Sequence, residues 1–130
     1  MIETIKRYFD AFNIGDTEGM LACLSDDIAH HVNEGGVRHG KDMFRDFCEH
    51  MDECYREELT DITLFITENG NRGAAEYVVN GTYLKTDDNL PEADGQTYTL
   101  PAGSFFTLDA GNITRITTYY NLADWHNQVS

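Results

Sequence analysis

The spacing of apolar residues changes once along this chain, and that change limits the folds that it can adopt. In the first half, apolar side chains recur every three or four residues, as at Ile2, Ile5, Phe9 and Phe12, which is the spacing of one helix face. From Glu57 onward, apolar and polar residues alternate, which is the period of a strand with one buried face. Helices followed by a run of strands predict an α+β fold.

Turn residues between the periodic stretches divide the chain into expected elements. Gly15 ends the first helix, and the polar stretch 86–95 separates two strands. In chain order we expect a helix at 2–12, a short helix from Asp16 or Thr17 that includes Leu24, a strand at about 27–33, a helix within 38–55, a four-strand antiparallel meander between Glu57 and Tyr120, and a short helix within 121–129. The 130 residues suit one domain, 1–130, in which a curved sheet packed by helices leaves a pocket on its concave side.

The charge of the chain argues against several kinds of partner. It holds 23 acidic and 9 basic residues, a net charge of −14, so we expect neither nucleic acid nor an anionic membrane to bind it. It has no apolar run of about 18 residues, so neither a membrane span nor a signal peptide is expected. Cys23, Cys48 and Cys54 are odd in number and lack metal-site spacing, which favours reduced thiols in a cytoplasmic protein.

Three stretches resemble one family when their order and spacing are taken together. They are RYFDAFNIGDTEGMLACLSDDIAHHV at 7–32, RHGKDMFRDF at 38–47 and GNITRITTYYNLADW at 111–125. These stretches resemble the nuclear-transport-factor-2-like superfamily, and within it the SnoaL-like and ketosteroid-isomerase-related proteins. The resemblance implies a cone-shaped barrel, in which a strongly curved, mixed but mainly antiparallel sheet wraps around three N-terminal helices. It also implies a deep, mostly apolar pocket and a homodimer formed through the outer face of the sheet.

The resemblance to ketosteroid isomerase extends to some of its functional residues. That enzyme uses an Asp as the base, and a Tyr and a protonated Asp as hydrogen-bond donors. Tyr8 stands at the position of the tyrosine donor, whereas Val32 stands where the base is and Ser104 where the protonated acid is. Two of the three groups are therefore changed, and steroid isomerisation by that mechanism is not expected.

The stretch AHHVN, at 29–33, holds the candidate that replaces the lost base. Side chains alternate between the two faces of a strand, so an inward Val32 puts His30 inward as well and His31 outward. Imidazole titrates near neutral pH and suits proton transfer. We therefore predict His30 as the catalytic acid/base group and Tyr8 as the catalytic hydrogen-bond donor. The alternative is a histidine that is hydrogen-bonded in a polar pocket and has no catalytic duty.

The remaining predicted site residues bind the substrate. Asn33 could donate to a carbonyl group, although an Asn at such a place more often stabilises a turn. Aromatic side chains on the strands and the last helix suit a wall for a flat ligand, although ordinary core packing is the alternative for each of them. The predicted substrate-binding residues are Asn33, Val32, Tyr77, Tyr83, Ser104, Phe106, Tyr120 and Trp125.

Other chemistries are not favoured by the spacing of the residues. The histidines lack the i, i+4 spacing of helical metal ligands, so no metal is expected. No glycine loop that binds phosphate is present, and we expect no cofactor. Arg115 has the wrong parity for an inward, epoxide-hydrolase-like arginine if Thr118 and Tyr120 point inward.

The sequence leaves three functions open. The first is an enzyme that acts by general acid/base catalysis, through isomerisation or aldol-type cyclisation, on an apolar carbonyl compound in the pocket. The acidic stretch 87–94 is then either a lid or a solvated loop. The second is a non-catalytic protein that binds a small apolar ligand in the same pocket. The third is an interaction module whose pocket is filled by its own side chains.

Overall fold

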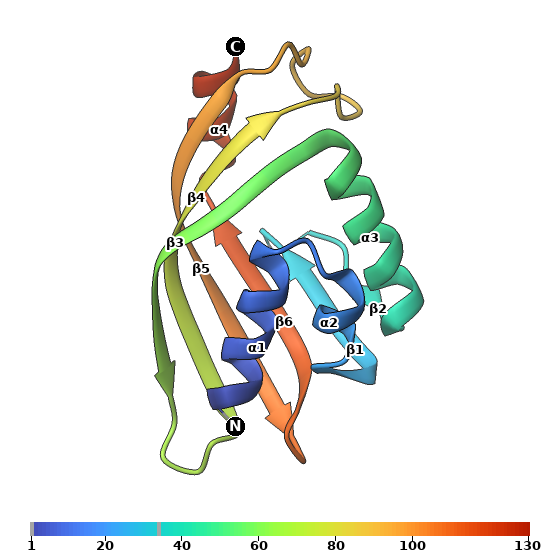
Figure 1. Cartoon of the computed structure of the whole chain (residues 1–130), viewed down its shortest axis with the longest axis vertical. Helices are drawn as coiled ribbons and strands as arrows, with labels where there is room; N and C mark the ends of the chain where they lie inside the picture. The colour runs from blue at the N-terminus through green and yellow to red at the C-terminus, as the bar shows by residue number, and fades with distance from the viewer. Residues whose placement is uncertain (1, 34) are drawn as a thin grey trace.

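The computed structural model describes residues 2–33 and 35–130 and consists of a curled sheet with helices packed against it (Figure 1). In chain order the elements are α1 (Ile2–Asn13), α2 (Thr17–Leu21), β1 (Leu24–Val32), β2 (Arg38–His39), α3 (Gly40–Cys54), β3 (Tyr55–Ile66), β4 (Arg72–Tyr83), β5 (Thr97–Asp109), β6 (Asn112–Tyr120) and α4 (Leu122–Val129). The predicted α+β class is confirmed.

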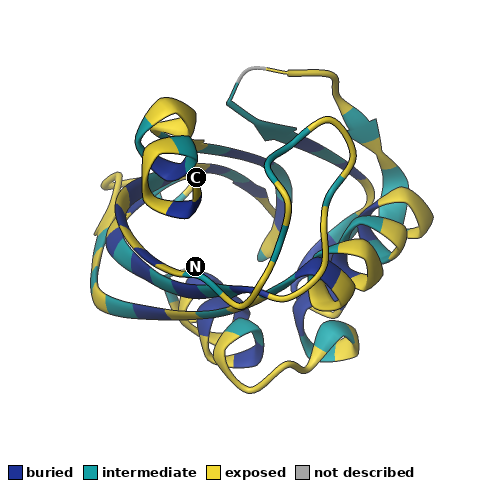
Figure 2. Cartoon of the chain, turned by 90° about the horizontal axis from the view of Figure 1, so that it is seen from above, coloured by how far each residue is buried: buried dark blue, intermediate teal, exposed yellow. Residues whose placement is uncertain are grey.

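The sheet has six strands in the order β2-β1-β6-β5-β4-β3. Strands β3 to β6 form the expected antiparallel meander, and β1 joins β6 in parallel, which makes the sheet mixed. Seen from above, the strands curve around an interior, and buried and exposed residues alternate along them (Figure 2). The sheet is curled rather than closed, because β2 and β3 remain at its two edges.

Irregular positions in the strands bend the sheet. The pairing of β3 with β4 shifts between Thr60 and Thr63, and Asp61 within this shift has a φ of 53°. A bulge of this kind bends a strand and increases its twist. The bend brings β3 toward the helices, so that one face of the sheet becomes the inside of a cone.

The helices cover the inside of the cone with aromatic side chains. Ile5, Tyr8 and Phe9 lie on the buried face of α1, and the Tyr8 ring packs edge-to-face on the rings of Phe44 and Phe106. Helix α2 is capped by Asp16, whose carboxylate accepts from the backbone N–H of Gly19 at 2.9 Å.

The first strand begins earlier than its sequence predicts. Leu24 does not extend α2, which ends at Leu21, but opens β1 and pairs with Ile113 of β6. The Ile113 N–H also donates to the Cys23 carbonyl at 2.9 Å. Ile113 is about 90 positions away from Leu24, so the local sequence does not indicate this pairing. The pairing outweighs the helical spacing of Leu24 with Met20 and Leu21.

The third helix lies within its expected range, and the residues on both sides of it join the sheet. Arg38 and His39 form the short strand β2, which pairs with β1, and α3 then starts at Gly40, whose φ is 87°. At its other end α3 passes directly into β3 after Cys54, whose carbonyl accepts from the Leu84 N–H at 2.8 Å. None of the helices in residues 2–33 and 35–130 is long and apolar enough to cross a bilayer.

Candidate functional site

A cavity of about 740 Å³ lies between the concave face of the sheet and helices α1, α3 and α4. Its size is that of a pocket for a small organic ligand. Apolar and aromatic side chains make most of its wall, and polar groups reach it from β1, β3, β4, β5 and β6. A second cavity of about 370 Å³ shares part of this wall, including Tyr8, Tyr55 and Glu57.

Most of the predicted site residues reach the larger cavity. Those that line it are Tyr8, His30, Val32, Asn33, Tyr77, Ser104, Tyr120 and Trp125. The strand alternation that put His30 on the same face as Val32 agrees with the structure, since both line the cavity, and Ser104 lines it as well. Arg115 lies on the other face, where it donates to the Thr107 and Thr117 hydroxyls at 3.1 and 2.7 Å.

Tyr83 does not belong to the wall of the cavity, contrary to the sequence prediction. It is fully buried, and its hydroxyl donates to the Pro91 carbonyl at 2.7 Å and accepts from the Asp87 N–H at 2.9 Å. Its ring stacks on that of Tyr55 with a centroid distance of 5.4 Å. Tyr83 therefore fastens the loop 84–96 instead of contacting a ligand.

Phe106 is also a core residue instead of a wall residue. It is fully buried, and its ring packs against those of Tyr8 and Phe9 at centroid distances of 6.1 and 5.8 Å. Its side chain points inward, but helix α1 covers it. The ordinary packing that the sequence left open as an alternative is what the structure has at this position.

His30 lies at the cavity in an aromatic surrounding and is 4% exposed. Its ring is 4.9 and 4.8 Å from the ring centroids of Phe44 and Phe47. Burial, together with the charges of Arg38 and His31, lowers the pKa of His30 to about 4. The imidazole is therefore neutral near pH 7, whereas the sequence argument assumed a group that titrates there.

The two ring nitrogens of His30 differ in their surroundings. Nδ1 is buried and has no hydrogen-bond partner among residues 2–33 and 35–130. Leaving a buried polar atom unpaired costs about 1–3 kcal/mol, and proteins leave buried N–H groups unpaired less often than acceptors. The proton is therefore favoured on Nε2, the nitrogen left to meet a ligand. His31 does not line the cavity, so the two histidines do not form a pair.

Tyr8 approaches the same part of the cavity from α1. Its ring centroid is 6.4 Å from that of Phe44, the ring that also packs on His30. Burial raises the pKa of Tyr8 well above its ordinary value, with smaller contributions from Cys48 and Tyr77. Its hydroxyl therefore stays protonated and is available as a hydrogen-bond donor.

Three hydroxyl groups form a chain along the concave wall. The Tyr77 hydroxyl is hydrogen-bonded to Ser104 Oγ at 2.7 Å, and Ser104 Oγ to Thr118 Oγ1 at 2.8 Å. They come from β4, β5 and β6, and Ser104 and Thr118 are direct partners in the pairing of β5 with β6. Thr118 is in turn the partner of Val32 on β1. These hydrogen-bonded hydroxyl groups thus cross most of the sheet toward β1, the strand that carries His30.

Asn33 has a structural role, although its side chain binds a neighbouring strand and not the turn that was expected. Its φ is 51°, and its Oδ1 accepts from the Tyr120 N–H at 2.9 Å. Its own N–H donates to the Thr118 carbonyl at 2.8 Å. Asn33 therefore ends β1 and fixes it to β6 at the edge of the cavity.

Glu57 lines both cavities, although the sequence argument did not include it. Its Oε2 accepts from the Tyr98 hydroxyl at 2.5 Å. Burial raises the pKa of Glu57, and the hydrogen bond from Tyr98 opposes that shift. Strand alternation could have identified Glu57, because it is two residues from the buried Leu59 on the same strand and therefore points to the same face. Its charged neighbours Arg56 and Glu58 made it look like part of a solvated face.

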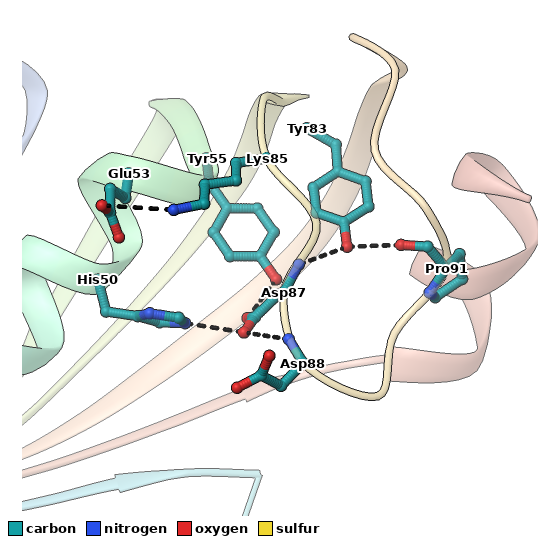
Figure 3. Close-up of polar contacts among 8 residues, drawn as sticks. All are labelled: His50, Glu53, Tyr55, Tyr83, Lys85, Asp87, Asp88 and Pro91. Carbon is teal, nitrogen blue, oxygen red and sulfur yellow. Dashed lines mark hydrogen bonds and ion pairs between the residues drawn. The ribbon is translucent and has the colours of Figure 1, made fainter.

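A polar cluster at the cavity, which we call the mouth cluster, consists of His50, Tyr55 and Asp87 (Figure 3). His50 Nε2 is 2.8 Å from Asp87 Oδ1, and the Tyr55 hydroxyl donates to Asp87 Oδ2 at 2.7 Å. Burial acts to raise the pKa of Asp87, but hydrogen bonds from Tyr55 and His50 outweigh it and lower the pKa. The stretch expected to be a lid or a solvated loop is thus fastened at Asp87 to α3 and β3.

One group of side chains has the donor types of a metal site. His50, Cys54 and Asp87 offer atoms that all lie within 4.8 Å of one another. His50 and Cys54 are four residues apart on α3, a spacing that the sequence argument missed because it compared histidines only with histidines. His50 and Asp87 already bond to each other, and burial raises the pKa of the Cys54 thiol. A divalent cation would have to displace both that hydrogen bond and a proton.

Comparison with solved structures places the chain among small proteins of one architecture. A proposed polyketide cyclase from Silicibacter sp. is 67% identical, with a TM-score of 0.96 over 98% of this chain and 93% of its own. Another from Pseudomonas putida is 49% identical, with a TM-score of 0.97 over 98% of this chain and 96% of its own. An NTF2-like protein from Burkholderia xenovorans is 17% identical, covers 99% and 95%, and has a TM-score of 0.79, which shows the fold alone.

Comparison with curated proteins and with family models gives different results. No curated protein matches the chain. The model of the SnoaL-like domain matches residues 5–116, which include every strand except the end of β6. This match covers most of the sequence and agrees with the suspected resemblance and with the curled sheet. The chain belongs to the SnoaL-like domain family.

Proposed function

We propose that this protein is an enzyme of the cyclase or isomerase type, which moves a proton within an uncharged, apolar carbonyl compound held in the 740 Å³ cavity. The observation that carries the proposal is the neutral, unpaired imidazole of His30 at a wall made largely of aromatic side chains. Family membership and the 67% identical relative, itself a proposed polyketide cyclase, support the general type of reaction.

His30 and Tyr8 act together on the carbonyl oxygen of the substrate. His30 Nε2–H and the Tyr8 hydroxyl donate hydrogen bonds to this oxygen as negative charge develops on it. Such donors are most effective where water is excluded and their orientation is fixed beforehand. Isomerisation and aldol-type cyclisation both pass through the enolate that these donors stabilise, so the same pair of groups serves either reaction.

The low pKa of His30 sets the acid limit of this activity. Because burial lowers that pKa to about 4, the imidazole stays neutral from about pH 5 to 8, and its charge does not change there. Protonation near pH 4 places a cation in the cavity. We therefore propose that pH changes above about 5 do not act through His30.

The proposal is tested with 2-tetralone, a flat, uncharged bicyclic ketone whose α-hydrogens exchange with D₂O. We expect the protein to accelerate deuterium uptake, measured by proton NMR. His30→Ala is expected to reduce the acceleration by about 100-fold, the usual scale for a lost hydrogen-bond donor to an oxyanion. The matched control His31→Ala changes the neighbouring side chain on the other face and leaves the acceleration intact. Equal acceleration in both variants, with both folded by circular dichroism, would contradict the role of His30.

A second candidate function is binding of the same kind of ligand without turnover. It is favoured by the aromatic wall that Tyr120 and Trp125 contribute to the cavity. Trp125 is the single tryptophan of the chain, so its fluorescence reports on the occupation of the cavity. Quenching of Trp125 by 2-tetralone together with no deuterium uptake would favour a carrier over an enzyme.

We also propose that two copies associate through the outer face of the sheet and that the protein acts in the cytoplasm. The support for association is a row of aromatic side chains on that face, Phe65 on β3, Phe105 on β5 and Tyr119 on β6, which are 55%, 46% and 39% exposed. The support for a cytoplasmic location is that all three cysteines are free and buried.

A further inference from the structure

Glu57 is a carboxyl group that the fold of the cavity does not explain. It is enclosed by the tyrosines of neighbouring strands, and none of the ion pairs found in residues 2–33 and 35–130 includes it. Glu57 is half-buried, and withdrawing a carboxylate even partly from water without an opposite charge is unfavourable. An apolar side chain at position 57 would cost less stability. We therefore look for a function of the carboxyl group.

The structure holds this carboxyl in position across a whole strand. Gly81 on β4 is the pairing partner of both Glu57 on β3 and Tyr98 on β5. The Tyr98 ring lies over Gly81, where any Cβ would collide with the ring and its hydroxyl, and its hydroxyl reaches Glu57 Oε2. The Tyr98 ring also packs against the Trp125 ring, with the two planes at 77°. Glu57 is thus fixed by one oxygen.

The other carboxylate oxygen of Glu57 is free. Oε2 accepts from Tyr98, whereas Oε1 has no hydrogen-bond partner in the described part of the chain and is not among its buried unpaired atoms. Since Glu57 lines the cavity, Oε1 is the oxygen that a ligand meets. A carboxylate fastened at one oxygen and open at the other has the geometry of a positioned base.

Glu57 and His30 lie on opposite sides of the cavity. His30 is on β1, next to one edge of the sheet, and Glu57 is on β3, at the other edge. The sheet curls, so these two strands face each other across the interior instead of lying side by side (Figure 2). A ligand between them can offer its carbonyl oxygen to His30 and Tyr8 and a neighbouring carbon to Glu57.

We propose that Glu57 is the base of this cavity and that Tyr98 is its positioning residue; the proposal rests on the proposed function. In the step, Glu57 Oε1 takes a proton from a carbon next to the carbonyl group, and the C–H electron pair forms the enolate. His30 and Tyr8 donate hydrogen bonds to the enolate oxygen. The resulting carboxylic acid then returns its proton to carbon, so that no oxidant, reductant or further reactant is needed.

The ionisation of Glu57 agrees with this role. Burial raises its pKa, which makes the carboxylate a stronger base than one in water. The groups that face it are the phenols of Tyr98 on β5, Tyr77 on β4 and Tyr120 on β6, whose own pKa values Glu57 helps to raise. All three are neutral near pH 7, so no fixed charge beside Glu57 competes for its proton.

The first test compares Glu57→Gln with Glu58→Gln in the 2-tetralone exchange reaction. Gln keeps the size of the side chain and a hydrogen-bond acceptor for Tyr98, but it removes the base. We expect Glu57→Gln to lose at least about 100-fold of the accelerated deuterium uptake. Glu58→Gln changes an exposed neighbour of opposite parity and should exchange at the wild-type rate. Quenching of Trp125 fluorescence should persist in both variants, because binding does not require the base.

The second test uses Tyr98→Phe to separate positioning from structure. The Tyr98 hydroxyl stabilises the charged carboxylate, so its loss raises the pKa of Glu57 further. The exchange rate requires the carboxylate form, and its rise with pH should therefore move to higher pH in this variant. A role of Tyr98 in packing alone would change the unfolding midpoint and leave the pH profile in place.

The outcomes separate this inference from the proposed function. Wild-type exchange at the uncatalysed rate would contradict the proposed function and, with it, the role of Glu57. Exchange that is lost in His30→Ala but kept at the wild-type rate in Glu57→Gln would overturn the role of Glu57 alone. Loss in Glu57→Gln with retained quenching, and a shifted pH profile in Tyr98→Phe, would support the inference.

Discussion

At the scale of single residues, Gly81 is the position where one methyl group has the largest expected effect. A Cβ there would overlap the Tyr98 ring. Gly81→Ala is therefore expected to displace that ring and to lower the free energy of unfolding by about 1–3 kcal/mol, the usual cost of overpacking. The measurement is equilibrium unfolding in urea.

Gly103 provides the control for this change. It lies on β5, and its added Cβ would make only an ordinary contact of 3.5 Å with the Ala75 carbonyl. Gly103→Ala should therefore stay close to the wild-type stability. Equal stability of the two variants would show that the Tyr98 ring can move aside at no cost, which contradicts a rigid Tyr98–Glu57 pair.

Side-chain parity could be read from the sequence, whereas depth and environment could not. The alternation at His30, His31 and Val32 correctly separated the inward from the outward side chains, because it depends only on strand geometry. The low pKa of His30 comes from burial against Phe44 and Phe47. These two rings lie on another element, so their effect requires the tertiary structure.

Some side chains on the inner face of the sheet do not reach the cavity. Tyr83 and Phe106 point inward, but the loop 84–96 takes up the hydroxyl of Tyr83 and helix α1 covers Phe106. Where a residue lies along the axis of the cone decides whether it contacts the cavity or the core. That position depends on the register of several strands, which a single strand pattern does not contain.

At the scale of elements, the loop 84–96 depends on one carboxylate. The Asp87 carboxylate accepts hydrogen bonds from the Tyr55 hydroxyl and the Asp88 N–H and is also hydrogen-bonded to His50. The backbone N–H of Asp87 donates to the Tyr83 hydroxyl. Asp87→Asn removes one of these acceptors. We expect backbone amides of residues 84–96 to exchange with D₂O about 10-fold faster, which is about 1.4 kcal/mol of local stability. Hydrogen exchange followed by mass spectrometry is the measurement, and Asp88→Asn is the matched control.

The same loop should respond to acid in a defined direction. The pKa of Asp87 is lowered in the folded protein, so its contribution to stability is complete above the ordinary Asp pKa of about 3.9 and is lost as pH falls through the lowered value. Protection of the loop in the wild type should therefore decrease below about pH 4, while that of Asp87→Asn should not change there. Parallel pH dependence in the two proteins would contradict the role of Asp87 as the fastening group.

Most elements could be predicted from local spacing, and the exceptions arise from pairing between strands. The helices α1 and α3 and the meander β3 to β6 follow from periods of 3.6 and 2. The early start of β1 at Leu24 and the short strand β2 arise from pairing with β6 and β1 respectively. The partner of Leu24 lies far along the chain on β6, whereas β1 comes shortly before β2, and in both cases the local spacing does not show which residues pair.

At the scale of the whole molecule, curvature creates an inner face for a ligand and an outer face for a partner. If the outer face joins two copies, Phe105 is central to it, since its ring packs on Tyr119 at 5.9 Å and it is 46% exposed. Phe105→Lys is expected to convert a dimer to a monomer, because burying an unpaired ammonium group is costly. Light scattering coupled to size-exclusion chromatography measures the mass.

Ile14 gives a control that adds the same charge elsewhere. It is 77% exposed and lies between α1 and α2, not on a strand of the sheet. Ile14→Lys should leave the mass unchanged. A wild-type mass of one chain at all concentrations would contradict association through the sheet. Because each copy carries a net charge of −14, added salt should favour the dimer by screening the repulsion between copies.

The chain of hydroxyls formed by Tyr77, Ser104 and Thr118 gives the cavity a property of its own. In both of its hydrogen bonds either oxygen can be the donor. If the three O–H bonds rotate together, Tyr77 changes from offering a lone pair to offering a hydrogen, while every heavy atom stays in place. One rigid wall can thus accommodate a ketone and its enol in turn, so that the two tautomers need not compete for differently shaped sites.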